Sequence, residues 1–365
     1  MFRFSSTVML GNYSARLKSL VVFVVKRSQR AGFLPENYAF PGGVIERAVD
    51  FDDGWRLHSN SLHDERASAP AFSRALWNEQ PVGRRLPPRL AFKVCALREL
   101  YEECGILLAF DNRAASLKTF VFDEARGMAV GTDGASLETA PSPRVVRQDP
   151  RRFVPIFGGQ TRYTLPLDSL HEWSNWLTPH FGEASKRRYD TLFYLCCLPE
   201  PCEFLLSADE LERAEWVVPR ELLRSACAAE TDVSIGPPQV YELSRLCRFT
   251  ELHELEEFAS GRAFRASLQR YTGQLVQSTT SGQLLLVLPG DRLHSTEGGA
   301  LNVAPRRLAA PADELAEGDA EQGPLHRIVF GGTERLLASQ WRILCNDFVD
   351  PTEHVVPIQS PFGTT

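Results

Sequence analysis

The segment from Pro87 to Gly105 constrains the fold of this chain more than any other. It opens on two prolines, which suit the first turn of a helix because that turn leaves its amide hydrogens unbonded. It ends at Gly105, and glycine readily adopts the left-handed conformation that follows a helix C-terminus. We therefore predict a helix from about Arg89 to Glu103.

This helix has two unlike faces at 100° per residue. The apolar face carries Leu90, Val94, Leu97, Tyr101 and Cys104. The opposite face carries Glu99, Glu102 and Glu103, at spacings where side chains are neighbours and like charges repel. Two explanations remain open: a solvated acidic face, or a site for a divalent cation such as Mg²⁺, which takes hard oxygen ligands.

The rest of the chain alternates predicted strands and helices. Residues 19–27 and 189–198 are β-branched, aromatic or otherwise apolar runs typical of strands, and Pro219 and Pro237 each begin a predicted helix. Residues 123–160 lack periodicity and are predicted to be a long surface segment. This alternation predicts a layered α/β or α+β fold.

Composition excludes several classes of protein. The 365 residues are 43% hydrophobic and carry a net charge of −6, which excludes a fibrous or wholly disordered chain and argues against a bulk nucleic-acid coat. The longest apolar runs are too short for a membrane-spanning helix, so we expect no membrane partner. Eight cysteines without a C-x-x-C pair indicate free thiols in a reducing compartment.

The N-terminus is basic and rich in hydroxyl groups. Its first acidic residue is Glu36. This composition is typical of a mitochondrial transit peptide, so we predict a mitochondrial targeting segment at residues 1–18. The alternative is an ordinary N-terminus that precedes the first strand.

The carboxylate helix resembles the second half of the Nudix box, in which R-E-U-x-E-E-x-G-U is the pattern (U, a large apolar residue). The run from Arg98 to Ile106 fills every fixed place of that half. The run from Phe40 to Glu46, FPGGVIE, resembles the glycine-rich lead-in to the box. A box split in this way, together with the runs at 173–179 and 188–191, resembles the (acyl-)coenzyme A diphosphatase branch of the Nudix hydrolases.

The resemblance implies a Nudix α/β/α sandwich at residues 19–230, with an insertion inside the box at about 50–88. Residues 231–365 are then a C-terminal extension that packs on the Nudix core. One place in the box departs from the pattern. The isolated glutamate is expected six residues after Gly43, where the chain has Val49. Glu46 or Asp50 are the candidates to replace it.

The resemblance also implies a metal-dependent site. The expected ligands of Mg²⁺ or Mn²⁺ are the carboxylates of Glu99, Glu102 and Glu103 and the backbone carbonyl of Gly42. Glu99 and Glu102 are the catalytic candidates for the base, and Arg98 is expected in the catalytic centre, holding a glutamate in place. The substrate-binding candidates are Arg27, Gly43, Arg188 and Asp190. Trp173 and Trp176 are expected in the core.

The implied reaction is hydrolysis of a nucleoside-diphosphate-linked substrate. The best candidate is coenzyme A or an acyl-CoA, cut to adenosine 3′,5′-bisphosphate and (acyl)phosphopantetheine. The alternative is an RNA 5′ pyrophosphohydrolase in mitochondria, working with RNA-binding proteins and using basic clusters at 144–152 and 186–188. A third alternative is a non-catalytic scaffold. The predicted location is mitochondrial because of the basic N-terminus, and the branch's peroxisomal C-terminal tripeptide is absent.

Overall fold

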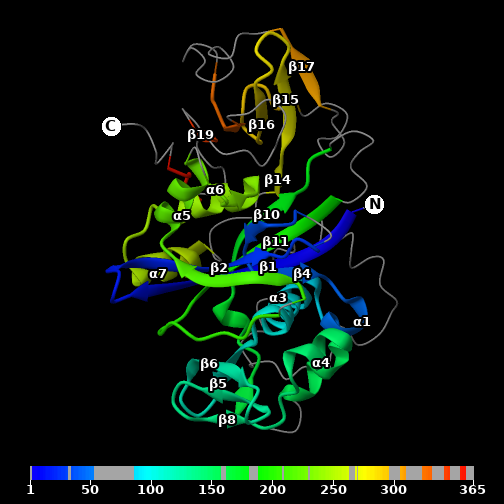
Figure 1. Ribbon diagram of the computed structural model, residues 1–365, viewed down its shortest axis with the longest axis vertical. Helices are drawn as coiled ribbons and strands as arrows, with labels where there is room; N and C mark the ends of the chain where they lie inside the picture. The colour runs from blue at the N-terminus through cyan, green and yellow to red at the C-terminus, as the bar shows by residue number, and fades with distance from the viewer. Residues whose placement is uncertain are drawn as a thin grey trace.

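The structure is a computed structural model. It describes residues 2–31, 34–52, 86–157, 162–180, 188–207, 209–228, 231–262, 268, 270–295, 305–309, 323–330, 341–345 and 354–358. Within these residues the strands form three sheets, and the largest lies at the centre of the molecule (Figure 1).

The central sheet has nine strands among the described residues. They are β1 (Phe2–Ser14), β2 (Ser19–Arg27), β3 (Asn37–Ala39), β4 (Gly42–Val44), β10 (His171–Leu177), β11 (Arg188–Cys197), β12 (Leu211–Val217), β13 (Ser234–Ile235) and β14 (Arg270–Thr272). Their order is β13-β3-β2-β1-β11-β10-β14, with β12 paired to β2 and β4 paired to β1. The predicted strands at 19–27 and 189–198 are confirmed as β2 and β11.

Two smaller sheets flank it. One contains β5 (Ile106–Asp111), β6 (Ser116–Asp123), β7 (Met128–Gly131), β8 (Ser136–Leu137) and β9 (Tyr163–Thr164). The other contains β15 (Gln274–Ser278), β16 (Leu284–Val287), β17 (Arg306–Leu308), β18 (Arg327–Phe330) and β19 (Arg342–Leu344). They lie at opposite ends of the molecule in Figure 1.

The α-helices are α1 (Arg47–Asp50), α3 (Pro88–Cys104), α4 (Pro143–Gln148), α5 (Pro219–Cys227), α6 (Pro237–Leu246) and α7 (Leu252–Arg262). Short 3-10 turns cover Pro150–Arg152, Val154–Ile156 and Leu167–Ser169. The predicted helix at 89–103 is confirmed as α3. It ends at Gly105, whose φ of 66° is the left-handed conformation that makes glycine suitable there.

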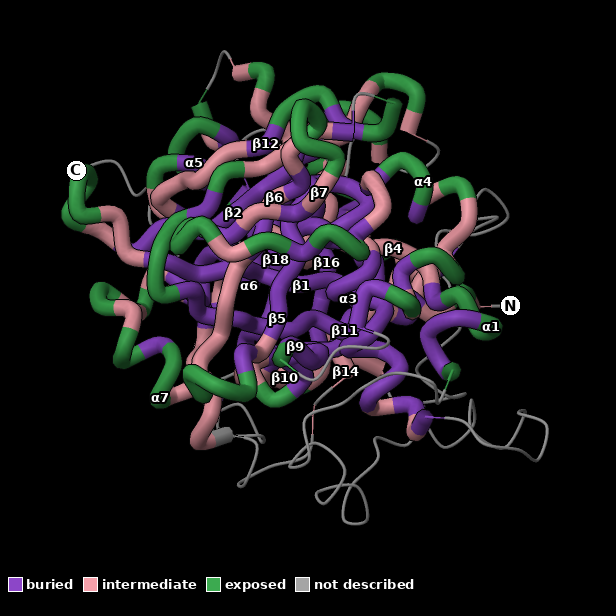
Figure 2. Tube along the Cα trace, turned by 90° about the horizontal axis from the view of Figure 1, so that it is seen from below, coloured by how far each residue is buried: buried purple, intermediate pink, exposed green. Residues whose placement is uncertain are grey.

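The central sheet has a hydrophobic core on each face, because successive side chains of a strand point to opposite faces. Val8 of β1 belongs to the core that contains α3, whereas its neighbour Met9 belongs to the core that contains α5, α6 and α7. In Figure 2 the tube along β1, β11 and α3 is buried. The predicted α/β class and α/β/α sandwich are therefore confirmed.

The acidic face of α3 is not solvated. Glu102 and Glu103 are both only 5% exposed, and Phe92, on the same side, is fully buried. The face packs on β1 and β4. The first of the two explanations, a solvated acidic face, therefore does not hold, because residues on both faces of the helix are buried.

Three segment predictions can be set beside the observed elements. Residues 2–14, placed in a targeting segment at 1–18, form β1, which pairs in parallel with β11 over ten residues and lies in the interior of the sheet. β13 and β14, which follow the predicted boundary at 230, belong to the central sheet. The domain boundaries at 18 and 230 stay predictions. The stretch at 123–160, predicted as a surface segment, contains β7, β8 and α4. These elements are too short to show a hydrophobic periodicity in the sequence. Most of the insertion at 50–88 lies outside the described residues.

Candidate active site

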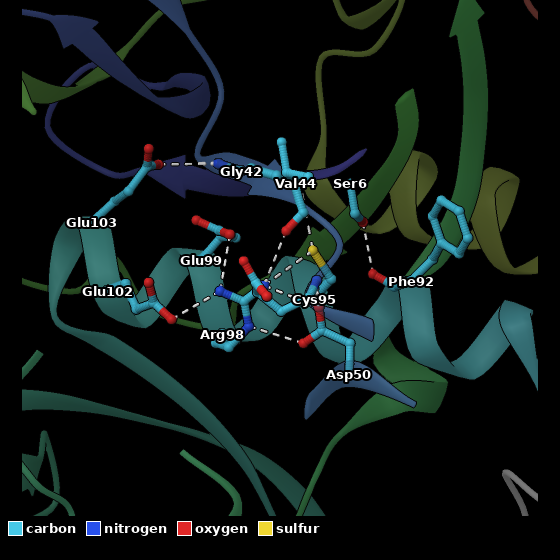
Figure 3. A network of polar contacts seen from close by, with 12 residues as sticks. Ser6, Gly42, Val44, Asp50, Phe92, Cys95, Arg98, Glu99, Glu102 and Glu103 are labelled. Atoms are coloured by element: carbon cyan, nitrogen blue, oxygen red, sulfur yellow. Dashed lines mark hydrogen bonds and ion pairs between the residues drawn. The ribbon is translucent and has the colours of Figure 1, made fainter. Parts of the chain in front are cut away.

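Arg98 lies at the centre of the carboxylate cluster on α3. Its Nε and Nη2 donate to the two carboxylate oxygens of Asp50 at 2.9 and 3.0 Å. Its Nη1 donates to Oε1 of Glu99 at 2.9 Å and to Oε1 of Glu102 at 2.8 Å (Figure 3). Arg98 is 1% exposed. A planar guanidinium in such a bidentate pair fixes the carboxylates in position, which is the structural part of the predicted role.

Asp50 occupies the place of the isolated acidic residue that the sequence left open. It is the last residue of α1, its side chain is fully buried, and its Oδ2 accepts a hydrogen bond from the Glu46 amide at 2.8 Å. Val49, at the expected place, is packed in the hydrophobic core instead. The carboxylate is thus displaced by one residue along the chain and still pairs with the arginine of the helix.

The glycine loop, Gly42 and Gly43, lies directly against the side chains of Glu99 and Glu103. The Gly42 amide donates to Oε2 of Glu103 at 3.0 Å. A Cβ on Gly43 would lie 2.4 Å from Cδ of Glu99, and one on Gly42 would lie 2.3 Å from the Ser6 carbonyl oxygen. Only glycine permits so close an approach of backbone to side chain. The hydroxyl of Thr7 donates to the Pro41 carbonyl and anchors the loop to β1.

Burial makes the charged form of these carboxylates unfavourable. It raises the pKa of Glu99 to about 8, against the opposing effect of Arg98 and with the support of Glu102 and Glu103. It raises the pKa of Glu103 to about 7, although the Gly42 amide and Arg27 lower it. The pKa of Glu102 is raised by the same cause. These buried carboxyl groups therefore hold their protons to a higher pH than exposed carboxyl groups do.

A divalent cation fits the chemistry of this donor set. Carboxylates and a backbone carbonyl are the hard oxygen ligands that Mg²⁺ prefers, and a bound cation would offset the cost of burying three negative charges. In the described residues no group of three His, Cys, Asp or Glu side chains already converges on one point as a metal cage. Glu99 and Glu102 turn toward Arg98, and Glu103 turns toward Gly42 (Figure 3). Mg²⁺ commonly uses only one or two carboxylates and retains waters.

Gly43→Ala should lower activity strongly. The added methyl group would overlap the Glu99 carboxylate, so that side chain must leave its position beside the loop. The matched control is Gly11→Ala, where the nearest atom would lie 3.4 Å away, an ordinary contact. Turnover of a diphosphate substrate should fall at least about tenfold in the first variant, since even about 1.4 kcal/mol of lost transition-state stabilisation is tenfold. Equal rates in the two variants would contradict the close approach.

A cavity of about 1090 Å³ begins at the glycine loop. Gly42 and Gly43 line it, whereas the carboxylates of α3 lie behind the loop. Of the described lining residues, Lys26 and Arg27 are the cations, both at the end of β2. Arg27 acts electrostatically on Glu103, and its Nε is buried without a hydrogen-bond partner. The predicted substrate residues Arg27 and Gly43 are therefore brought together beside the cluster.

The other two predicted substrate residues lie elsewhere. Arg188 is 8% exposed; its Nε donates to the Thr178 carbonyl at 2.9 Å, and its guanidinium lies over the Phe2 ring. Asp190 is 2% exposed and pairs with Arg270 at 2.6 Å. Neither lines the cavity. Their side chains join neighbouring strands, and the substrate role stays a prediction for both.

The two tryptophans and the basic clusters at 144–152 and 186–188 were the remaining candidates. Trp173 and Trp176 are buried, as expected, and their indole nitrogens both donate to Glu242 of α6. In the basic cluster at 144–152, Arg147 donates to the Glu102 carbonyl and pairs with Asp209, while Arg151 and Arg152 pair with Asp149. Lys186 and Arg187 lie outside the described residues.

Several residues near the site carried no sequence signal. Ser6 ties β1 to α3 through a 2.7 Å hydrogen bond to the Phe92 carbonyl, and the Cys95 thiol donates to the Gly43 carbonyl at 3.8 Å. Thr7 and Lys26 line the cavity. These contacts join segments far apart in the sequence, so only the strand order reveals them.

Comparisons with known proteins agree with the geometry. A family model described as the NUDT19 Nudix domain matches residues 4–246. The acyl-coenzyme A diphosphatase NUDT19 of Gallus gallus is 34% identical over 328 residues, which cover 86% of this chain and 82% of that protein. The Homo sapiens protein of the same name is 32% identical over 324 residues, covering 84% and 80%.

Among solved structures, a NUDIX hydrolase from Alicyclobacillus acidocaldarius is 20% identical, with a TM-score of 0.47, and covers 70% of this chain and 96% of that one. The relatives give the RNA alternative no support. In the part of the chain that the structure describes, no helix has the length and apolar character needed to cross a bilayer. With two thirds of its length matched by one family model, the chain belongs to the NUDT19 Nudix domain family and is a Nudix pyrophosphatase.

Proposed function

We propose that this protein hydrolyses the diphosphate of coenzyme A or an acyl-CoA, giving adenosine 3′,5′-bisphosphate and (acyl)phosphopantetheine, with Mg²⁺ or Mn²⁺ as cofactor. The observation that carries the proposal is the meeting of the buried carboxylates of α3 with a glycine loop that lines a large cavity, beside Arg27. The names of the Gallus gallus and Homo sapiens relatives support the choice of substrate.

The reaction requires water to attack one phosphorus of the diphosphate. A phosphorus–oxygen bond forms, and the bond from that phosphorus to the bridging oxygen breaks. The leaving phosphate departs with the bridging oxygen, and the proton of the water passes to a base. Glu99 is the proposed base because it lies against Gly43, at the start of the cavity, and is the most exposed of the three carboxylates.

The remaining residues orient the reactants. Glu102, Glu103 and the Gly42 carbonyl would hold the cation, which supplies charge neutralisation at the diphosphate. Arg27 and Lys26 line the same end of the cavity and would contact the phosphates. Arg98 and Asp50 keep Glu99 and Glu102 in position without facing the substrate.

Removal of divalent cations should abolish turnover. Purified protein treated with EDTA should leave CoA intact, and added Mg²⁺ or Mn²⁺ should restore hydrolysis. The same assay should include acyl-CoAs, NADH, ADP-ribose and a 5′-triphosphate RNA, with products identified by mass. Hydrolysis of CoA substrates in preference to the others supports the proposal. Unchanged turnover in EDTA would contradict the cofactor, and turnover of RNA alone would contradict the substrate.

A further inference from the structure

The floor of the cavity crosses the central sheet at right angles to its strands. One row of paired residues runs from Val44 on β4 through Ser5, Thr191 and Trp176 to Tyr271 on β14. The first four of these residues line the cavity. Four steps at the usual strand spacing of about 4.8 Å make the row about 19 Å long.

The chemistry of the lining changes along this row. The charged lining residues are Lys26, Arg27, Glu36 and Asp232, and all lie on or beside β2, β3 and β13. Beyond the hydroxyls of Ser5 and Thr191, which bond each other at 2.6 Å, the lining becomes aromatic and aliphatic. Trp176 stacks on Tyr271 with ring centroids 4.9 Å apart, Phe193 belongs to the same hydrophobic core, and Leu177 also lines the cavity.

The C-terminal part of the chain lines the apolar end. Gly273 follows β14 directly, and Leu286 comes from β16 of the second flanking sheet. A Cβ on Gly273 would lie 2.5 Å from Cδ1 of Leu286, so the two residues are in close contact at this end. Leu286 itself is 3% exposed.

We propose that this apolar end binds the acyl chain of an acyl-CoA, and that Leu286, packed on Gly273, limits the length of chain it accepts. The inference rests on the proposed function, which places the diphosphate at Gly42. A 3′-phosphorylated nucleoside is polar and anionic, and the charged end is where the described lining has cations, Lys26 and Arg27, beside the carboxylates of Glu36 and Asp232. The uncharged pantetheine arm then lies along the other direction of the row, where no described lining residue is charged, and brings the start of the acyl chain to the far end beside Leu286.

Chain length gives the inference a quantitative form. Each methylene moved from water into an apolar site contributes about fourfold to kcat/KM, at about 0.8 kcal/mol per methylene. Across a series from free CoA through acetyl-, hexanoyl-, octanoyl- and dodecanoyl-CoA, kcat/KM should rise with length and then level off or fall once the chain meets Leu286.

The test compares Leu286→Phe with Leu284→Phe. Both substitutions enlarge a leucine of β16, but Leu284 does not line the cavity. In the Leu286 variant kcat/KM should fall at least tenfold for dodecanoyl-CoA and stay within twofold for free CoA. In the Leu284 variant the whole series should follow the parent protein. Leu286→Ala should move the plateau to longer chains, and thermal unfolding verifies that each variant is folded.

The possible failures are distinguishable. If the parent protein hydrolyses free CoA but kcat/KM is independent of chain length, the acyl site is wrong and the proposed function stands. The same holds if Leu286→Phe reduces free CoA and dodecanoyl-CoA turnover equally. If neither CoA nor any acyl-CoA is cut, both the proposed function and the inference fail.

Discussion

Glu103→Gln should lower kcat by about a hundredfold or more while the protein remains folded. The substitution removes a charge that would hold the cation, and a lost interaction of several kcal/mol with the transition state corresponds to at least that factor. The fold should survive because the amide oxygen of glutamine still accepts the hydrogen bond from the Gly42 amide. Initial rates with CoA and Mg²⁺, together with the thermal unfolding midpoint, measure the two effects separately.

The matched control for this variant is Glu210→Gln. Glu210 is exposed and acts electrostatically on Glu103, but it is not part of α3. Its kcat should change by less than a few fold. Loss of activity in both variants to the same degree would mean that net charge near the site, rather than the Glu103 carboxylate itself, determines the rate.

Asp50→Ala should reduce the free energy of unfolding by about 3–5 kcal/mol, the usual effect of leaving one partner of a buried ion pair uncompensated. Asp50 is fully buried and Arg98 is 1% exposed, so water cannot replace the lost carboxylate. Activity should fall as well, because Arg98 also positions Glu99 and Glu102. Denaturant unfolding gives the stability change, and Asp50→Glu, which restores a carboxylate, should recover part of it.

Exposed ion pairs of Asp149 provide the control for the stability loss expected in Asp50→Ala. Asp149 pairs with Arg151 and Arg152 at 3.8 and 3.6 Å, and all three side chains are well exposed. Exposed pairs contribute about 0–1 kcal/mol, so Asp149→Ala should change stability by no more than that. Similar losses in Asp50→Ala and Asp149→Ala would show that the Arg98 pair has no special structural role.

The catalytic helix was predictable because its signals are local. Proline at one end, Gly105 at the other and a carboxylate spacing of three and four residues are all read within one segment. Burial of the acidic face was not predictable, since it depends on β1 and β4, which the helix meets only in the folded chain. The identity of Asp50 as the partner of Arg98 has the same origin: the two lie 48 residues apart, across the insertion.

The N-terminal segment shows what composition alone does not reveal. An acid-free, basic start is typical of a targeting peptide, yet residues 5–12 are buried in the sheet. Side chains on one face of β1 pack against α3, and those on the other face pack against α5, α6 and α7. These helices come much later in the sequence. Arg188 and Asp190 carry charge next to a family-like motif, but their side chains contact Thr178 and Arg270 within the sheet, which the sequence does not show.

The most direct test of the proposed function is the mass of the products formed from CoA. With Mg²⁺ present, the diphosphatase reaction gives equal amounts of adenosine 3′,5′-bisphosphate and 4′-phosphopantetheine, and the Glu103→Gln protein gives neither. Intact CoA under these conditions, or dephospho-CoA from loss of the 3′-phosphate alone, would contradict cleavage of the diphosphate at the carboxylate helix.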